Sequence, residues 1–167
     1  MNSQPLKYIA HFIFLVLLQG IVLNNIQLFG YANVFIYIIF LITLPCDFSR
    51  GWTLIIGFLL GLSIDIFSNT FGIHAFATVC AALARIYLLK FFAPRNDRYA
   101  EIIPSIASFG LGSFFKYCLL MVLIHHTILF VIDYFSFVDF FDIALHILLS
   151  SAFTLSLLMG IEKFKTK

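Results

Sequence analysis

The chain has 167 residues, of which 62% are apolar, 18% are aromatic and only 11% are charged, with a formal net charge of +2. Soluble domains carry about a quarter charged residues, so this composition excludes a water-soluble globule, and its aromatic content excludes a disordered chain. The small net charge gives no reason to expect a nucleic-acid partner. We therefore expect an all-α integral membrane protein that forms a single membrane domain over residues 1–167.

The first apolar run is long enough to cross a membrane twice. No Lys, Arg, Asp or Glu occurs between Lys7 and Asp47, a run about twice the ~20 residues that span a bilayer core. A polar, glycine-ended patch at residues 24–30 predicts a turn in its middle. We expect transmembrane helices over about residues 6–23 and 31–45, and we expect the first to stay attached because no signal-peptide cleavage site follows it.

Four further spans are predicted downstream. Proline and charge at residues 45–51 end the second span, and the polar turn 68–72 separates the third from the fourth. The charged stretch 93–101 must lie in water, and we expect 102–111 to lie along the membrane surface, with a seventh, bent span as the less favoured alternative. The six predicted spans are 6–23, 31–45, 52–67, 73–92, 112–132 and 143–160.

The basic residues predict an orientation, because Lys and Arg are retained on the cytoplasmic side of a membrane. With the N-terminus inside, all ten fall at cytoplasmic ends or inner halves of spans, and the outer connections hold asparagines and aspartates instead. The ten are Lys7, Arg50, Arg85, Lys90, Arg95, Arg98, Lys116, Lys163, Lys165 and Lys167. We therefore expect a multi-pass protein of the bacterial inner membrane with both termini cytoplasmic.

Two glycines in the third predicted span favour close helix packing. Gly57 and Gly61, here called the glycine stripe, are four residues apart, and small residues on one helix face let a neighbouring helix approach. Asp65 lies four residues further along the same face. An intramembrane carboxylate is by default a functional hypothesis. Two interpretations stay open for Asp65: a structural role in capping a helix or fastening the loop, or a partner contact or ion relay.

The fourth predicted span carries two polar side chains on one face. His74 and Arg85 are eleven residues apart, which is three helical turns. They share their face with the small residues Ala77, Thr78, Ala81 and Ala84, and this face suits packing against the glycine stripe.

The turn before this span brings its polar residues close to Asp65. The turn ends at Gly72, so Asp65 and His74 are expected at the same outer end, where a hydrogen bond or ion pair would fasten the hairpin. A proton relay is the alternative. Arg85 lies near the cytoplasmic end, where we expect it to reach the interface or to meet Asp47.

Metal-binding and catalytic signatures are weak. His125 and His126 are adjacent, so on a helix their side chains point about 100° apart and cannot both chelate one ion. The three cysteines have no metal-ligand spacing, and a glutamate-metal membrane protease is excluded because Glu101 and Glu162 both fall in cytoplasmic segments. No nucleophile elbow or phosphate-binding glycine loop is present. We expect no enzyme activity, no cofactor and no metal.

Several segments together resemble one family. They are Gln19, Leu28-Phe29-Gly30, Leu44-Pro45, the stretch from Gly57 to Ala75, Glu101-Ile102-Ile103-Pro104 and the pair His125-His126. Over nearly the whole chain they resemble the MreD family of rod shape-determining proteins, particularly its Bacteroidetes-type form.

The resemblance implies a non-enzymatic membrane subunit of the machinery for peptidoglycan synthesis during cell elongation. Its expected partners are MreC and, through it, MreB, RodA and a class B penicillin-binding transpeptidase, besides membrane lipid. The implied fold is similar to the six-helix substrate-binding subunits of energy-coupling vitamin transporters. The resemblance carries no catalytic residue, and Gly57, Gly61, Asp65, Gly72, His74, Ala77, Ala81 and Arg85 are expected to pack helices and position partners.

The same fold similarity supplies a rival function, the substrate-binding subunit of a vitamin-uptake transporter. Such subunits dock on their partner through alanines spaced four apart in the first helix, and residues 11–20 contain no such pair. The outer connections are expected to be short and poor in ligand-binding polar groups. A small proton-coupled carrier is a third possibility, which depends only on Asp65, His74 and Arg85.

Overall fold

The computed structural model describes residues 4–28, 30, 32–94, 102–134 and 140–165. Within them, five helices are long and apolar enough to cross a membrane, and the chain is a multi-pass, mostly helical membrane protein. The first runs over Pro5–Asn25 and comprises α1 (Gln4–Leu17), a π-helical segment (Leu18–Val22) and a 3-10 turn (Leu23–Asn25). The others are α3 (Arg50–Ser68), α4 (Ile73–Phe92), α6 (Leu111–Tyr134) and α7 (Phe140–Lys165).

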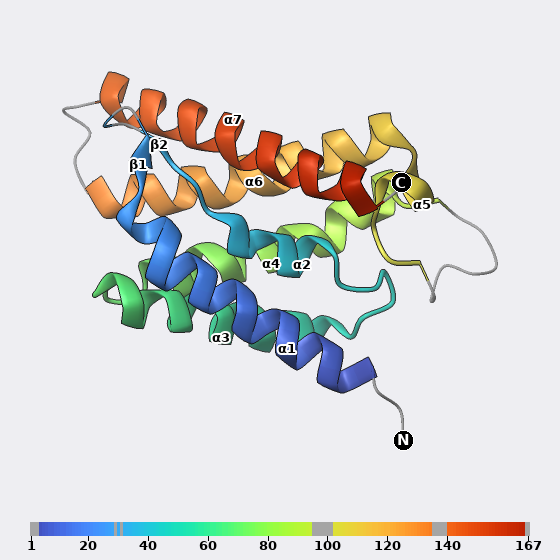
Figure 1. Cartoon of the computed structure of the whole chain (residues 1–167). Coiled ribbons are helices and arrows are strands. Elements are labelled where there is room, and N and C mark those ends of the chain that lie inside the picture. The colour runs from blue at the N-terminus through green and yellow to red at the C-terminus, as the bar shows by residue number, and fades with distance from the viewer. Residues whose placement is uncertain (1–3, 29, 31, 95–101, 135–139, 166–167) are drawn as a thin grey trace.

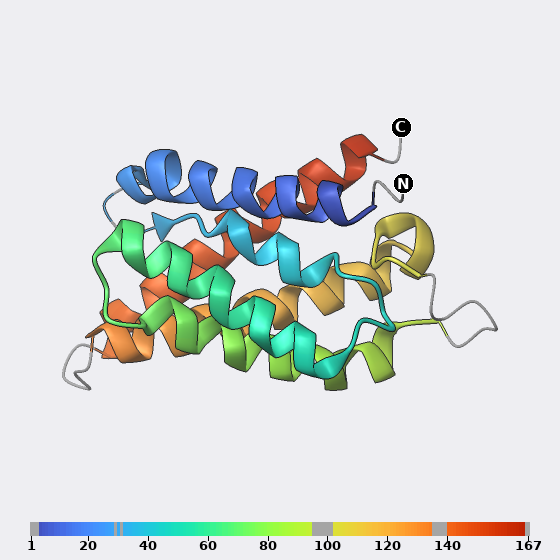
Figure 2. The same cartoon turned by 90° about the horizontal axis from the view of Figure 1, so that it is seen from below.

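The five long helices form one elongated bundle. In Figures 1 and 2 they run along its length, and the first described turn of α1 and the last of α7 lie at the same end. We call this the terminal end. The opposite end, the hairpin end, holds a small antiparallel pair, β1 (Gln27–Leu28) with β2 (Ala32–Asn33), and the turn between α3 and α4. In the interior, α4 packs against α3 and α6, and α6 packs against α7.

The prediction that the second span is a helix is wrong. Residues 31–45 were expected to be helical, yet within the described part of this range only a 3-10 turn (Ile36–Ile38) and α2 (Ile39–Ile42) are. The segment still runs through the bundle from the hairpin end to the terminal end (Figures 1 and 2). Every residue of 34–42 is buried, so its uniform hydrophobicity reflects burial by protein on all sides and not a lipid-facing helix. We call residues 32–45 the broken segment.

The segment 102–111 forms a one-turn helix and not a further span. Ser105 begins α5 (Ile106–Phe109) with a capping box, in which its side chain accepts from the Ser108 backbone N–H. Gly110, with a φ of +77°, then turns the chain into α6. The Ile102 carbonyl accepts a hydrogen bond of 2.8 Å from the Cys46 N–H, so this segment is tied to the end of the broken segment.

Candidate functional site

The glycine stripe is the contact line between α3 and α4. A Cβ atom at Gly61 would collide with the Thr78 hydroxyl, the His74 carbonyl and Ala75. A Cβ at Gly57 would lie 3.1 Å from the Ala82 Cβ, a tight contact that still leaves room for small shifts. Thr78 also donates a hydrogen bond of 2.8 Å to the Gly57 carbonyl. The two helices therefore approach closely because α3 has no side chains on this line.

The small residues of α4 that meet the stripe are only partly those expected, since Thr78 was expected on this face and Ala75 and Ala82 were not. The nearest are Ala75, Thr78 and Ala82, whereas Ala77 and Ala81 are fully buried but are not among the closest atoms to either glycine. Successive helical residues point about 100° apart, so this one-residue offset places the two predicted alanines toward the rest of the core.

Asp65 caps the N-terminus of α4 with both carboxylate oxygens. Oδ1 accepts from the His74 backbone N–H at 3.0 Å and from the Thr70 hydroxyl at 2.5 Å, and Oδ2 accepts from the Ala75 N–H at 2.9 Å. The turn before α4 ends at Gly72, whose φ of +86° favours glycine. Asp65 thus fastens the hairpin through the backbone of His74, and not through the imidazole as the sequence led us to expect.

Gln19, on the first helix, stabilises the broken segment through its side-chain amide. The Gln19 amide donates to the Val34 carbonyl at 3.0 Å and accepts from the Ile36 N–H at 2.9 Å. Gln19 is 1% exposed and lies in the π-helical segment that ends the first helix. It therefore supplies the partners that a regular helix would have given to these two backbone groups.

Helix α7 supplies two hydroxyls from the other side of the segment. The Asn33 N–H donates to the Ser150 hydroxyl at 3.0 Å, and the Phe35 N–H donates to the Thr154 hydroxyl at 3.1 Å. Ser150 and Thr154 are one helical turn apart, and alternate residues of an extended chain point the same way. The spacing of the two hydroxyls on α7 thus matches the extended backbone at residues 33–35.

A buried network of imidazoles surrounds Tyr37. Its hydroxyl lies 2.9 Å from His74 Nδ1 on α4 and 2.8 Å from His125 Nε2 on α6. Because a hydroxyl has one hydrogen, it donates to one imidazole and accepts an N–H from the other. The ring of Phe35 packs between these histidines, with centroids 5.7 Å from His74 and 6.1 Å from His125.

The network continues to α7 through His126. The Val122 carbonyl can only accept, so His126 Nδ1, 2.8 Å away, carries the proton. His126 Nε2 is then the acceptor for the Thr154 hydroxyl, at 3.3 Å. Hydrogen bonding therefore connects the broken segment, α6 and α7. The two adjacent histidines also meet each other, with Nδ1 atoms 3.5 Å apart, so their side chains do not diverge as their spacing predicted.

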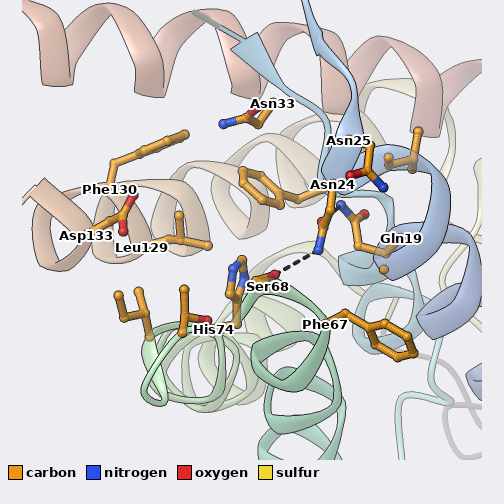
Figure 3. A pocket seen from close by; sticks show the side chains of 15 residues that line it. Gln19, Asn24, Asn25, Asn33, Phe67, Ser68, His74, Leu129, Phe130 and Asp133 are labelled. Carbon is orange, nitrogen blue, oxygen red and sulfur yellow. Dashed lines mark hydrogen bonds between the residues drawn. The ribbon is translucent and has the colours of Figure 1, made fainter.

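A cavity of about 410 Å³ opens at the hairpin end, and its wall includes His74. Figure 3 shows polar side chains from four parts of the chain around it. Among the described lining residues the polar ones are Gln19, Asn24, Asn25, Asn33, Ser68, Thr70, His74 and Asp133. The expectation that this end is poor in ligand-binding polar groups is therefore wrong, because turns far apart in sequence bring their asparagines together.

Hydrogen bonds hold one wall of this cavity in place. Gln19 donates to the Asn24 side chain at 2.9 Å, and Asn24 donates to the Ser68 hydroxyl at 2.8 Å, the bond drawn in Figure 3. Asp133 is the only acidic side chain, and no Lys or Arg occurs, among the described lining residues. The cavity therefore suits a polar ligand that is neutral or positively charged.

Arg85 lies near the terminal end, inside the bundle. Its guanidinium donates to the Leu44 and Pro45 carbonyls, which follow the C-terminus of α2. A cation at this position also complements the negative end of the helix dipole. The expected contact with Asp47 is not formed, since no ion pair joins these two described residues. Arg85 thus stabilises the end of the broken segment as Gln19 stabilises its beginning.

The described residues contain no group of three or more His, Cys, Asp or Glu side chains placed to hold a metal ion. Cys46 lies in the connection between α2 and α3, where burial raises the pKa of its thiol to about 11, against the opposing effect of Arg85. The thiol therefore stays protonated near neutral pH and is a poor nucleophile.

Sequence reasoning missed the residues that stabilise the broken segment from other helices. Tyr37, Ser150 and Thr154 gave no signal, because single hydroxyls in apolar runs are common. Gln19 entered only through a resemblance, although a lone amide inside a charge-free span is itself a reason to expect a buried polar partner.

Comparisons of the chain with protein-family models, with curated proteins and with solved structures find no match.

Proposed function

We propose that this chain is a non-enzymatic scaffold of the bacterial cell-elongation complex, similar to MreD, that binds MreC and helps to organise lateral peptidoglycan synthesis. The stretch from Gly57 to Ala75 contributes most to the resemblance, and it forms the α3–α4 hairpin. The observation that carries the proposal is that both oxygens of Asp65 are bound to the α4 backbone. A carboxylate held in this way builds the hairpin and is not free to shuttle ions.

The proposed topology has six crossings of the inner membrane, with both termini in the cytoplasm. Five crossings are the long helices, and the sixth is the broken segment, which runs the length of the bundle. The terminal end carries the basic residues Lys7, Arg50, Lys90, Lys116 and Lys163. By the positive-inside rule, this distribution supports a cytoplasmic location for the terminal end.

A second candidate function is the binding of a small polar molecule, as in the substrate subunit of a vitamin transporter. The polar cavity at the hairpin end favours it, since about 410 Å³ lies within the ~300–1,000 Å³ usual for ligand sites. Three asparagines line this cavity, and of these Asn24 also bonds to Gln19 and Ser68, which leaves Asn25 and Asn33 as the residues to replace. Their replacement tests the second candidate separately from the scaffold.

Depletion of the protein in its own host, with complementation by variants, tests the proposal. We expect depleted cells to lose rod shape, and wild-type protein but not Gly61→Leu to restore shape and co-purification with MreC. Leu59→Ala is the matched control, because Leu59 lies on the same helix but is 48% exposed and outside the glycine stripe.

Other phenotypes would point to the rivals. Normal shape with a growth requirement for one vitamin, relieved by wild-type protein but not by Asn25→Leu with Asn33→Leu, would replace the scaffold with the transporter subunit. Altered ion flux at normal shape would favour the carrier.

A further inference from the structure

The cavity at the hairpin end has a neighbour that shares part of its lining. This second hollow has a volume of about 370 Å³ and is lined by Gln27, Asn33, Phe130, Asp133, Tyr134 and His146. Asn33, Phe130 and Asp133 line both hollows, so these three residues lie where the two meet. We call the two hollows together the paired cavity. It has room for a ligand larger than the first hollow alone would hold.

A carboxylate lies at this junction without a basic partner. Asp133 is exposed near the end of α6, and its side chain forms no ion pair and no hydrogen bond with the described residues. The only described lining side chains that can carry a positive charge are the imidazoles of His74 and His146. No Lys or Arg occurs in the three stretches of chain that contain the whole described lining, residues 8–49, 51–84 and 117–162. The paired cavity therefore attracts cations and disfavours anions.

A buried imidazole nitrogen provides a second point of attachment. His74 is 6% exposed, and its Nδ1 is bound to the Tyr37 hydroxyl. Its Nε2 has no hydrogen-bond partner among the described residues and is not sealed inside the protein, so it opens into the cavity that His74 lines. In Figure 3 the ring rises from α4 toward the middle of the labelled side chains. A buried nitrogen without a partner favours a ligand that bonds to it.

Two amides supply further hydrogen bonds. The Asn33 side chain makes no hydrogen bond within the described structure, since only its backbone N–H is bound. Asn25 uses one amide N–H, which donates to the Ile21 carbonyl at 2.7 Å. Each side chain therefore keeps a carbonyl oxygen and an N–H for a ligand. Hydroxyl groups suit these amides, because a hydroxyl both donates and accepts.

The junction also has an aromatic wall. Phe130 precedes Asp133 by three residues on α6, so both lie on one face of the helix. The ring of Phe130 packs against that of Phe35, with centroids 6.0 Å apart, and both rings line the first hollow. Aromatic faces attract ammonium groups. A cation bound to Asp133 would therefore be favoured by the ring beside it as well.

We propose that the paired cavity binds a small ammonium compound that also carries hydroxyl groups. Its ammonium group bonds to the Asp133 carboxylate beside Phe130. Its hydroxyl groups bond to the amides of Asn25 and Asn33 and to His74 Nε2. The proposal rests on the second candidate function, whose ligand class it names, and it is independent of the scaffold function.

Three probes of similar shape test the ligand class. Glucamine, sorbitol and gluconate share a polyhydroxyl chain and end in an ammonium, a hydroxymethyl and a carboxylate group, respectively. Each is added at neutral pH and constant ionic strength to the full-length protein, labelled with ¹⁵N-histidine, in phosphate buffer and a polyoxyethylene detergent that contain no other ammonium compound or sugar. The NMR signal of His74, identified by its absence in His74→Gln, reports binding. We expect it to respond to glucamine at an about tenfold lower concentration than to sorbitol, and least to gluconate.

Variants of the lining separate charge from hydrogen bonding. Asp133→Asn removes the charge and keeps the size, so it should abolish the preference for glucamine and leave the response to sorbitol unchanged. Asn33→Leu should weaken the response to both probes several-fold. Asp142→Asn is the matched control and should keep the preference, because Asp142 is an exposed acid in the first turn of α7, at the same end but outside both described linings. Helix content by circular dichroism checks that each variant is folded.

Three outcomes would overturn the proposal. Equal responses to glucamine and sorbitol would exclude the ammonium class but leave the polar site of the second candidate function. A response to none of the probes would overturn the proposal together with the polar site on which it rests. A loss of preference in Asp142→Asn as large as in Asp133→Asn would show that general attraction of cations to this end accounts for the effect. Cell shape tests the scaffold separately in each case.

Discussion

Several buried polar side chains of this bundle bind backbone groups that no regular helix satisfies. Asp65 caps the start of α4, Gln19 binds an extended part of the broken segment, and Arg85 binds carbonyls after α2. In lipid each unsatisfied backbone group costs several kcal/mol, so each departure from helix needs a local partner. Polar residues in the spans therefore mark where the chain is irregular.

The capping role of Asp65 predicts a graded loss of stability. An asparagine offers one acceptor oxygen and would place an N–H₂ group against one backbone N–H, so Asp65→Asn should lower the free energy of unfolding by about 1 kcal/mol. Asp65→Leu leaves both N–H groups without an acceptor and should cost about 2–3 kcal/mol. Unfolding of the purified protein by sodium dodecyl sulfate, followed by circular dichroism, measures both.

The exposed Asp142, in the first turn of α7, provides the control. Asp142→Asn removes only a helix-dipole interaction and should cost about 0.5 kcal/mol. If Asp65→Asn were as stable as wild type and yet failed to restore rod shape, the charge itself would be required, and the ion-relay interpretation would have to return.

Among the elements, the α3–α4 pair depends on close approach of two backbones. Gly61 has no space for a Cβ, whereas Gly57 has its nearest atom at 3.1 Å. Gly61→Ala should therefore destabilise the protein by about 1–3 kcal/mol through overpacking, and Gly57→Ala by less. The same unfolding assay compares them with Gly160→Ala, where a Cβ meets nothing within 4 Å of the described atoms. Equal gains in stability at all three positions would show that helix propensity, and not packing, governs them, because alanine is the better helix former.

The broken segment is the element that differs most from its neighbours. Its residues 34–42 are buried and only partly helical, so the segment relies on side chains from two other helices. Such backbone is tolerated at membrane depth only inside protein. The conformation of the broken segment therefore depends on the helices that pack around it.

The two hydrogen bonds from Gln19 to the broken segment predict that Gln19 contributes to the stability of the fold. Gln19→Leu leaves the Val34 carbonyl and the Ile36 N–H without their partner, which should lower the free energy of unfolding by about 2 kcal/mol or more. Gln27→Leu is the control, because Gln27 is exposed in β1. A Gln19→Leu protein with unchanged stability would show that the amide is dispensable and that packing alone holds the segment.

The sequence predicts the long helices well and the broken segment poorly. Polar turns at residues 24–30 and 68–72 delimit the first, third and fourth helices within a few residues, because polar groups and hydrocarbon do not mix. Residues 31–45 are as hydrophobic as a membrane-spanning helix. Hydropathy reports the surroundings of a segment and not its backbone conformation, so it does not reveal that this segment is irregular. Their true partners, Ser150 and Thr154, are more than a hundred residues away, beyond any local pattern.

At the scale of the whole molecule, the two ends differ in chemistry. The hairpin end has a cavity lined mainly by amides and hydroxyls, and the terminal end has a cavity lined by three cations. Between them, the described core is apolar apart from the histidine network and the polar contacts around it. This polarity matches a bilayer whose two faces attract different charges.

The proposed even number of membrane crossings leads to the final prediction. In a cysteine-free background, Lys7→Cys and Lys163→Cys should both be protected in intact cells from an impermeant maleimide, whereas Phe71→Cys should react. Phe71 is fully exposed in the turn between α3 and α4, at the end opposite both termini. If the broken segment did not cross, the N-terminus and residue 163 would lie on opposite sides, and one of the two lysine variants would be labelled from outside. Labelling of both after the membrane is permeabilised shows that each site is accessible, so protection in intact cells reports sidedness alone.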